Sequence, residues 1–103
     1  MQVVSIVSGI FFKAKIDDIV KRFGKNAFCA TIAEIQSHNP VVIILDLEHP
    51  HALEVLRKYG KSVIAFGPHM RTDLLTIAAE FGAQVYPRST FFNQLDRLLH
   101  LHE

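Results

Sequence analysis

The chain has 103 residues, of which 50% are hydrophobic, and this is enough for one domain with a single core and too few for two. Eleven lysines and arginines against ten acids leave a formal net charge of +1, so no strongly basic surface for nucleic acid is expected. No apolar run reaches the roughly 18 residues of a membrane span, and the first residues lack the features of an export signal. We therefore expect a single cytoplasmic domain over residues 1–103, with neither nucleic acid nor a membrane as its partner.

The first half of the chain predicts two βα units. A strand is expected over residues 3–7, because this run is rich in valine and isoleucine. A second strand, over residues 27–30, leads into Thr31 and Glu34, whose spacing fits the capping box that starts a short helix. The helix between the two strands is expected to bury one face, made of Ile16, Ile19, Val20 and Phe23.

The second half predicts three more βα units, with strands over residues 41–45, 62–66 and 83–86. The first of these reads Val-Val-Ile-Ile-Leu, which indicates a central strand buried on both faces. Ser89 or Thr90 is expected to cap the last helix. The inner faces of the three helices are expected to be Ala52, Val55, Leu56 and Tyr59; Leu74, Ile77, Ala78 and Phe81; and Phe92, Leu95, Leu98 and Leu99.

A single acid, Asp46, follows the central strand directly. Repeated βα units form a parallel sheet through right-handed crossovers, and ligands gather where the carboxyl ends of its strands meet. Asp46 is therefore expected at the functional edge of the sheet. The alternative, that it only caps a loop or pairs with a neighbour, stays open.

Two longer segments resemble the receiver domains of response regulators. SHNPVVIILDLEHPHALEVLRK is similar to the receiver pattern in which a short helix and a proline lead into a strand ending at the phosphoaccepting aspartate. AAEFGAQVYPRSTFFNQLDRLL is similar to the ending of that family, with its alanine-rich helix, Gly-Ala, strand, basic residue and final helix. The likeness covers nearly the whole chain and places Asp46 at the phosphoacceptor. It implies a flavodoxin-like (βα)5 three-layer sandwich, with a five-stranded parallel sheet in order 2-1-3-4-5.

The chain departs from the receiver pattern at the groups that phosphorylation uses. Ser8 and Gly9 stand where the family has the acidic pair that holds Mg²⁺. Gly67 replaces the switching Ser or Thr after the fourth strand, and Arg88 matches the lysine after the fifth. Because Mg²⁺ prefers several oxygen ligands, we expect no cofactor and only weak Mg²⁺ binding, if any, at Asp46. The resemblance thus implies a degenerate, stand-alone pseudo-receiver.

Three functions follow from this interpretation. The one we favour is a signalling module of two-component type that works by docking to a protein, with phosphorylation dispensable. The second is a phosphoacceptor response regulator, in which a histidine kinase phosphorylates Asp46. The third is a domain that binds a small anionic ligand at a rim made of Ser8, Gly9, Asp46, Gly67 and His69. An enzyme is not expected, because no Gly-rich phosphate loop, nucleophile elbow or pair of carboxylates is present.

The resemblance also implies a surface for partners, because receivers signal through the last strand and the two helices beside it. Tyr86 and Phe91 are the expected anchors there, whereas Phe92 is expected in the core. The expected partner is a histidine kinase or another signalling protein, and a second copy of the chain is a further candidate.

Two expectations concern the polar groups near this edge. Asp46 and Arg88 are expected to lie on neighbouring strand ends and to form an ion pair, which would hold the edge in one state. Four of the six histidines come as two sequence pairs, in the His-Pro-His loop and near the C-terminus. No metal site is expected from them, because a rigid site draws three or four ligands from fixed elements.

Overall fold

Strands and helices alternate along the chain in the computed structural model, which describes all 103 residues. The strands are β1 (Gln2–Ile6), β2 (Lys25–Phe28), β3 (Val42–Asp46), β4 (Val63–Gly67) and β5 (Gln84–Pro87). The helices are α1 (Ile10–Val20), α2 (Ile32–His38), α3 (Ala52–Tyr59), α4 (Thr72–Glu80) and α5 (Arg88–His100), with a 3₁₀ turn η1 (Gly60–Ser62) after α3. None of the helices is both long and apolar enough to cross a membrane.

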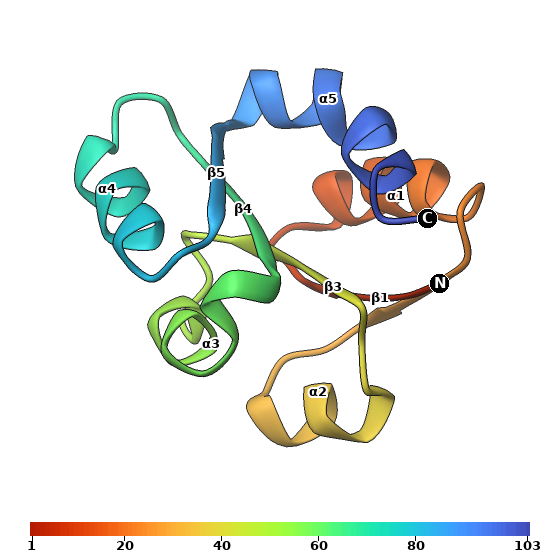
Figure 1. Ribbon diagram of the computed structural model, residues 1–103. Helices are drawn as coiled ribbons and strands as arrows, with labels where there is room; N and C mark the ends of the chain where they lie inside the picture. The colour runs from red at the N-terminus through yellow and green to blue at the C-terminus, as the bar shows by residue number, and fades with distance from the viewer.

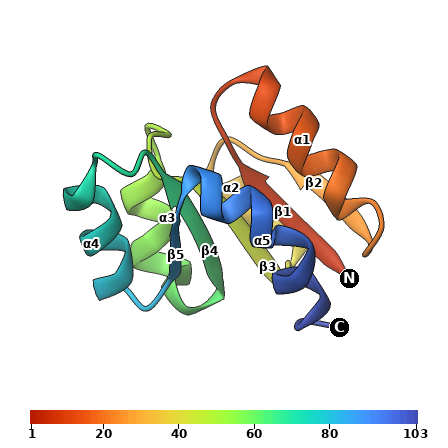
Figure 2. The ribbon, with the colours of Figure 1, turned by 90° about the horizontal axis from the view of Figure 1, so that it is seen from above.

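The five strands form one parallel sheet in the order β2-β1-β3-β4-β5, with helices on both faces (Figure 1). This is the three-layer flavodoxin-like arrangement, so the predicted fold class and strand order are confirmed. Helices α1 and α5 lie on one side of the sheet, and α2, α3 and α4 lie on the other, as Figures 1 and 2 show.

Alternate residues of the strands supply two separate cores, because successive side chains of a strand point to opposite faces of the sheet. Ile43 and Leu45 of β3 pack toward α2, α3 and α4, while Val42 and Ile44 pack toward α1 and α5. Every residue of β3 is buried, which confirms that the uniformly apolar run is a central strand covered on both faces.

The edge strand β2 begins at Lys25, two residues before the expected start. Its first residues are polar and partly exposed, so hydrophobic pattern alone does not reveal them. Backbone pairing decides the start instead, because Lys25 donates its N–H to the carbonyl of Met1 and is the register partner of Gln2.

The helix starts agree with the sequence in one case and differ in another. Thr31 caps α2 as expected: its hydroxyl accepts from the N–H of Glu34 at 3.3 Å, and the Glu34 carboxylate accepts from the N–H of Ala30 at 3.2 Å. Neither Ser89 nor Thr90 caps α5, because Pro87 precedes the helix directly and both residues already lie in its first turn.

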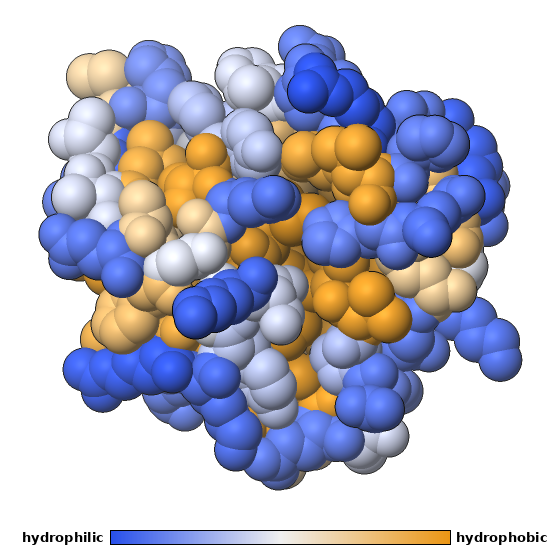
Figure 3. Space-filling view, in the orientation of Figure 1, coloured by the Kyte–Doolittle hydropathy of each residue, from blue (hydrophilic) through white to orange (hydrophobic).

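Helix α4 is covered less completely than expected. Ala78 is its one buried residue, Leu74 is half-buried, and Ile77 and Phe81, both expected to face inward, are exposed. Ile77 lines a hollow with Leu53 and Leu56 of α3, and Phe81 lines a second hollow beside the end of α3, so the packing of α4 against α3 is open at these two residues. Apolar surface is visible over α4 in the space-filling view of Figure 3.

Candidate functional site

Asp46 ends β3 and is 2% exposed. Its Oδ2 accepts a hydrogen bond from the backbone N–H of Ser8 at 3.1 Å, and its Oδ1 accepts one from the backbone N–H of Glu48 at 3.0 Å. A buried carboxylate needs such donors, because burial removes the water that would otherwise solvate it. Asp46 therefore caps two loops, the one between β1 and α1 and the one between β3 and α3. These contacts are the ones expected from the alternative interpretation of the sequence, in which Asp46 caps a loop.

The sequence-predicted rim residues lie around Asp46 at the ends of β1 and β4. Ser8 and Gly9 are exposed in the loop after β1, and Gly9 has a φ of 86°, in the region that favours glycine. Gly67 is buried at the end of β4. A β-carbon added there would meet Leu47 at 3.4 Å, which is ordinary packing distance, so a side chain would fit but no hydroxyl is present.

The two acids of α1, Asp17 and Asp18, lie in the second half of the helix. Asp17 accepts from the side-chain amide of Asn26 at 3.4 Å, and Asp18 pairs with Lys21 at 3.0 Å. Lys21 holds the pKa of Asp18 below its ordinary value. No three His, Cys, Asp or Glu side chains lie together as a metal site requires. The residues at the edge therefore do not provide the set of carboxylate oxygens that Mg²⁺ prefers.

Arg88 pairs with Glu48 and not with Asp46, so the ion pair expected across the edge does not form. Its Nη2 donates to the Glu48 carboxylate at 2.8 Å, while its Nε is buried and has no hydrogen-bond partner. The expectation fails because backbone donors already hold both Asp46 oxygens. The Arg88 side chain instead lies over the ring of Phe12, with its Cζ 4.6 Å from the ring centroid.

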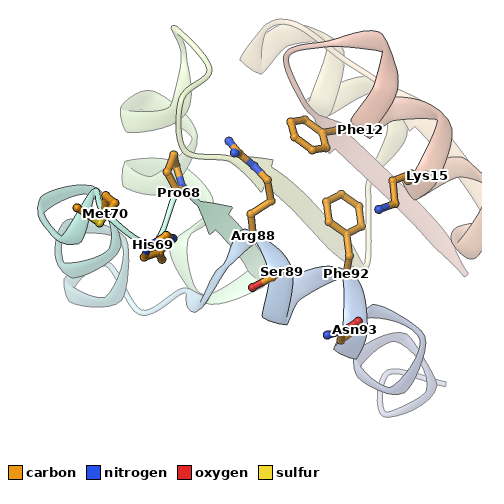
Figure 4. A pocket seen from close by; sticks show the side chains of 9 residues that line it. All are labelled: Phe12, Lys15, Pro68, His69, Met70, Arg88, Ser89, Phe92 and Asn93. Atoms are coloured by element: carbon orange, nitrogen blue, oxygen red, sulfur yellow. The ribbon is translucent and has the colours of Figure 1, made fainter.

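A hollow of about 600 Å³ opens beside Arg88, between α1, the loop after β4 and the start of α5 (Figure 4). Two of its residues, His69 and Arg88, were predicted from the sequence as part of the functional edge. The hollow is lined by Phe12, Lys15, Pro68, His69, Met70, Arg88, Ser89, Phe92 and Asn93. The sequence does not reveal Phe12, Lys15 and Asn93 as site residues, because they share no motif and meet only through the packing of α1 against α5.

Two aromatic residues of α5, Phe91 and Phe92, differ in burial from what the sequence predicted. Phe91, the expected partner anchor, is fully buried and stacks on Phe66 with ring centroids 4.5 Å apart. Phe92, expected in the core, is half-buried and lines the hollow. The signal was available in the spacing, because Phe91 lies four residues before Leu95 and so shares its face of the helix. Tyr86, the second expected anchor, is half-buried.

His49 and His51 follow Asp46 in the loop before α3. The Nδ1 of His49 accepts from the backbone N–H of His51 at 3.1 Å, and His51 contacts the Glu54 carboxylate at 3.2 Å. Burial and the positive charge of a protonated His51 lower the pKa of His49, although the Asp46 carboxylate opposes the shift. The neutral form of His49 suits this loop, since a proton on Nδ1 would remove the acceptor.

Exposed apolar side chains gather at the carboxyl edge, which we define as the carboxyl ends of the strands, the loops after them and the first turns of the following helices. Ile10 and Phe11 begin α1, Phe28 ends β2, Leu53 lies in the first turn of α3 and Met70 lies in the loop after β4. Sequence reasoning did not single out these residues, because they share no motif and come to one edge only through the topology of the sheet.

No family model matches the sequence, and a comparison with curated proteins finds no significant relative.

Proposed function

We propose that this domain is a receiver-like signalling module that acts by docking to a protein partner, without phosphorylation of Asp46. The observation that carries the proposal is the state of Asp46, which is 2% exposed and accepts hydrogen bonds from the backbone at both carboxylate oxygens. The candidate partner is a histidine kinase or another signalling protein.

The geometry supports a module in which phosphorylation is dispensable. A phosphoryl donor has to approach a carboxylate oxygen within bonding reach, and here the loops carrying Ser8 and Glu48 cover both oxygens. Gly67 offers no hydroxyl to a phosphoryl group, and Arg88 pairs with Glu48 and not with Asp46. Stabilisation of the charge that develops in phosphoryl transfer is therefore weak at this edge.

The exposed apolar side chains support docking at the carboxyl edge. Phe11 is 69% exposed and Ile10 and Met70 are more exposed still, although large apolar side chains usually find cover within a single domain. Aromatic residues and methionine are enriched in protein interfaces. A partner that covers Phe11 and Met70 would remove this surface from water. This edge replaces Tyr86 and Phe91 as the proposed centre of the docking surface.

Site-specific photo-crosslinking in cells tests the docking surface. A photoreactive phenylalanine analogue is placed at residue 11 and, as a matched control, at residue 101, because Leu101 is 70% exposed at the other end of the molecule. We expect one discrete crosslinked species from residue 11 and none from residue 101. Equal crosslinking from both residues, or none from residue 11, would contradict the proposed surface.

A further inference from the structure

We infer that the hollow beside Arg88 binds a small organic phosphate, whose phosphate group Arg88 holds, with Lys15 adding attraction from the other side of the rings, and whose apolar body lies against Phe12 and Phe92. The inference concerns a ligand site and goes beyond the docking function. It does not depend on the docking surface, because its evidence is the charge, shape and lining of the hollow.

The lining of the hollow is basic. It contains Lys15, His69 and Arg88 and no carboxylate, although the chain as a whole has a net charge of only +1. Lys15 forms no ion pair in the structure, whereas Lys21 and Arg22 on the same side of the fold both do. Walls that carry one sign of charge raise the local concentration of ligands of the opposite sign.

The two main cations are placed against aromatic rings. The Nζ of Lys15 is 4.7 Å from the centroid of Phe92, and the Cζ of Arg88 is 4.6 Å from the centroid of Phe12. These two rings stack on each other, with centroids 5.7 Å apart and planes 20° apart. Figure 4 shows Lys15 and Arg88 flanking the pair of rings. The rings keep water from one side of each cation, so that an anion is attracted more strongly than in open solvent.

Arg88 has donors to spare. A guanidinium carries five N–H groups in a fixed fork that matches phosphate, and one of them bonds to Glu48. The Nε of Arg88 is buried, so the donors open to a ligand are those on the Nη groups of this 32% exposed side chain. Glu48 is 43% exposed and is the carboxylate that competes with an incoming anion for Arg88. Removing its charge should therefore strengthen binding of a phosphate.

The size and apolar lining of the hollow indicate more than a bare ion. Its volume of about 600 Å³ falls within the range of small-molecule sites, roughly 300 to 1,000 Å³. Pro68, Met70 and the two rings supply apolar surface, and Ser89 and Asn93 add polar groups that can fix orientation. A phosphate attached to a planar or aliphatic body uses both kinds of lining. The two basic side chains favour a phosphate dianion over a singly charged carboxylate.

Titration followed by two-dimensional amide NMR tests the class of ligand. The probes are phenyl phosphate, inorganic phosphate and benzoate. We expect phenyl phosphate to shift the amide signals of His69, Ser89 and Asn93 saturably, with a Kd below about 1 mM. Inorganic phosphate and benzoate should each bind at least about fivefold more weakly, because each lacks one half of the recognised chemistry. Absence of saturable shifts, or equal binding of benzoate, would overturn the inference.

Three variants and a control test the residues. Arg88→Met should weaken phenyl phosphate binding by about tenfold, Lys15→Met should weaken it by about threefold because Lys15 acts from a greater distance, and Glu48→Gln should strengthen it. Lys58→Met removes the same charge from the exposed side of α3 and should leave binding unchanged. If Lys58→Met weakens binding as much as Lys15→Met, the attraction is non-specific and the inference is wrong. Lys15→Met decides the matter alone if Arg88→Met does not fold.

Discussion

The guanidinium of Arg88 lies 2.8 Å from the carboxylate of Glu48, while the carboxylate of Asp46, two residues earlier in the chain, is held by backbone N–H groups. The basic residue of the edge is thus tied to an exposed acid and the buried acid is tied to the main chain. Because the two acids are held differently, we expect the loss in free energy of unfolding to differ when Glu48 or Asp46 is replaced.

The Arg88–Glu48 pair should contribute little to stability. Its side chains are 32% and 43% exposed, so water screens the attraction. We expect a double-mutant cycle with Arg88→Met and Glu48→Gln to give a coupling free energy of about 0.2–1 kcal/mol in urea unfolding. A coupling on the order of 3 kcal/mol, the cost of breaking a buried pair, would contradict the geometry described here for Arg88.

Asp46→Asn should destabilise the fold more than its conservative chemistry suggests. The amide has one acceptor oxygen, so one of the two N–H groups, that of Ser8 or that of Glu48, would face another donor. We expect the free energy of unfolding to fall by about 1–3 kcal/mol. Asp96→Asn, at an exposed acid on α5, is the control and should cost under about 1 kcal/mol. Equal costs for the two variants would show that the backbone bonds of Asp46 do not matter.

The fold should lose stability in mild acid, in part through His49. Burial and His51 lower the pKa of His49 in the folded chain below its ordinary 6.5, so the unfolded chain binds the proton more readily. The stabilisation from neutral His49 is therefore complete above about pH 6.5 and is lost as the pH falls through the lower folded-state pKa. We expect His49→Gln to reduce the difference in unfolding free energy between about pH 7.5 and pH 5.5.

The control for this pH dependence is His100→Gln, which changes an exposed histidine near the end of α5. Urea unfolding of both variants at the two pH values provides the comparison. An equal effect of the two substitutions would mean that the loop around His49 is not the source of the pH dependence of stability.

Two buried glycines should respond differently to alanine. A β-carbon at Gly67 would meet Leu47 and Leu75 at 3.4–3.8 Å, and Gly67→Ala should change stability by less than about 1 kcal/mol. A β-carbon at Gly60 would collide with the backbone carbonyl of Phe81, so Gly60→Ala should cost on the order of 2 kcal/mol. Thermal unfolding of the two variants is the measurement. A larger loss from Gly67→Ala would contradict the packing at the end of β4.

The sequence predicts most of this fold because its signals are local and agree with one another. The apolar run of β3 and the capping pair Thr31 and Glu34 each specify their element directly. The exposure of Ile77 and Phe81 could not be predicted in the same way, because it depends on how closely α4 packs against α3.

The candidate site was predictable only in part. The position of Asp46 follows from strand order, since a parallel sheet brings the carboxyl ends of its strands to one edge. The choice of partner for Arg88 does not follow, because Asp46 and Glu48 are only two residues apart in the sequence and the backbone geometry decides between them. The hollow is hidden for a similar reason: Lys15 and Phe92 are distant in sequence and meet only when α1 packs against α5.

The affinity of the purified domain for the partner captured from residue 11 tests the proposed function most directly. Phe11→Ser should weaken binding by about tenfold or more, whereas the equally exposed Leu101→Ser should leave it unchanged. Asp46→Asn, checked for an intact fold, should bind the partner nearly as well as the original chain, because no phosphorylation signal is lost. Loss of binding in folded Asp46→Asn, or equal affinities for Phe11→Ser and Leu101→Ser, would contradict docking through the carboxyl edge without phosphorylation.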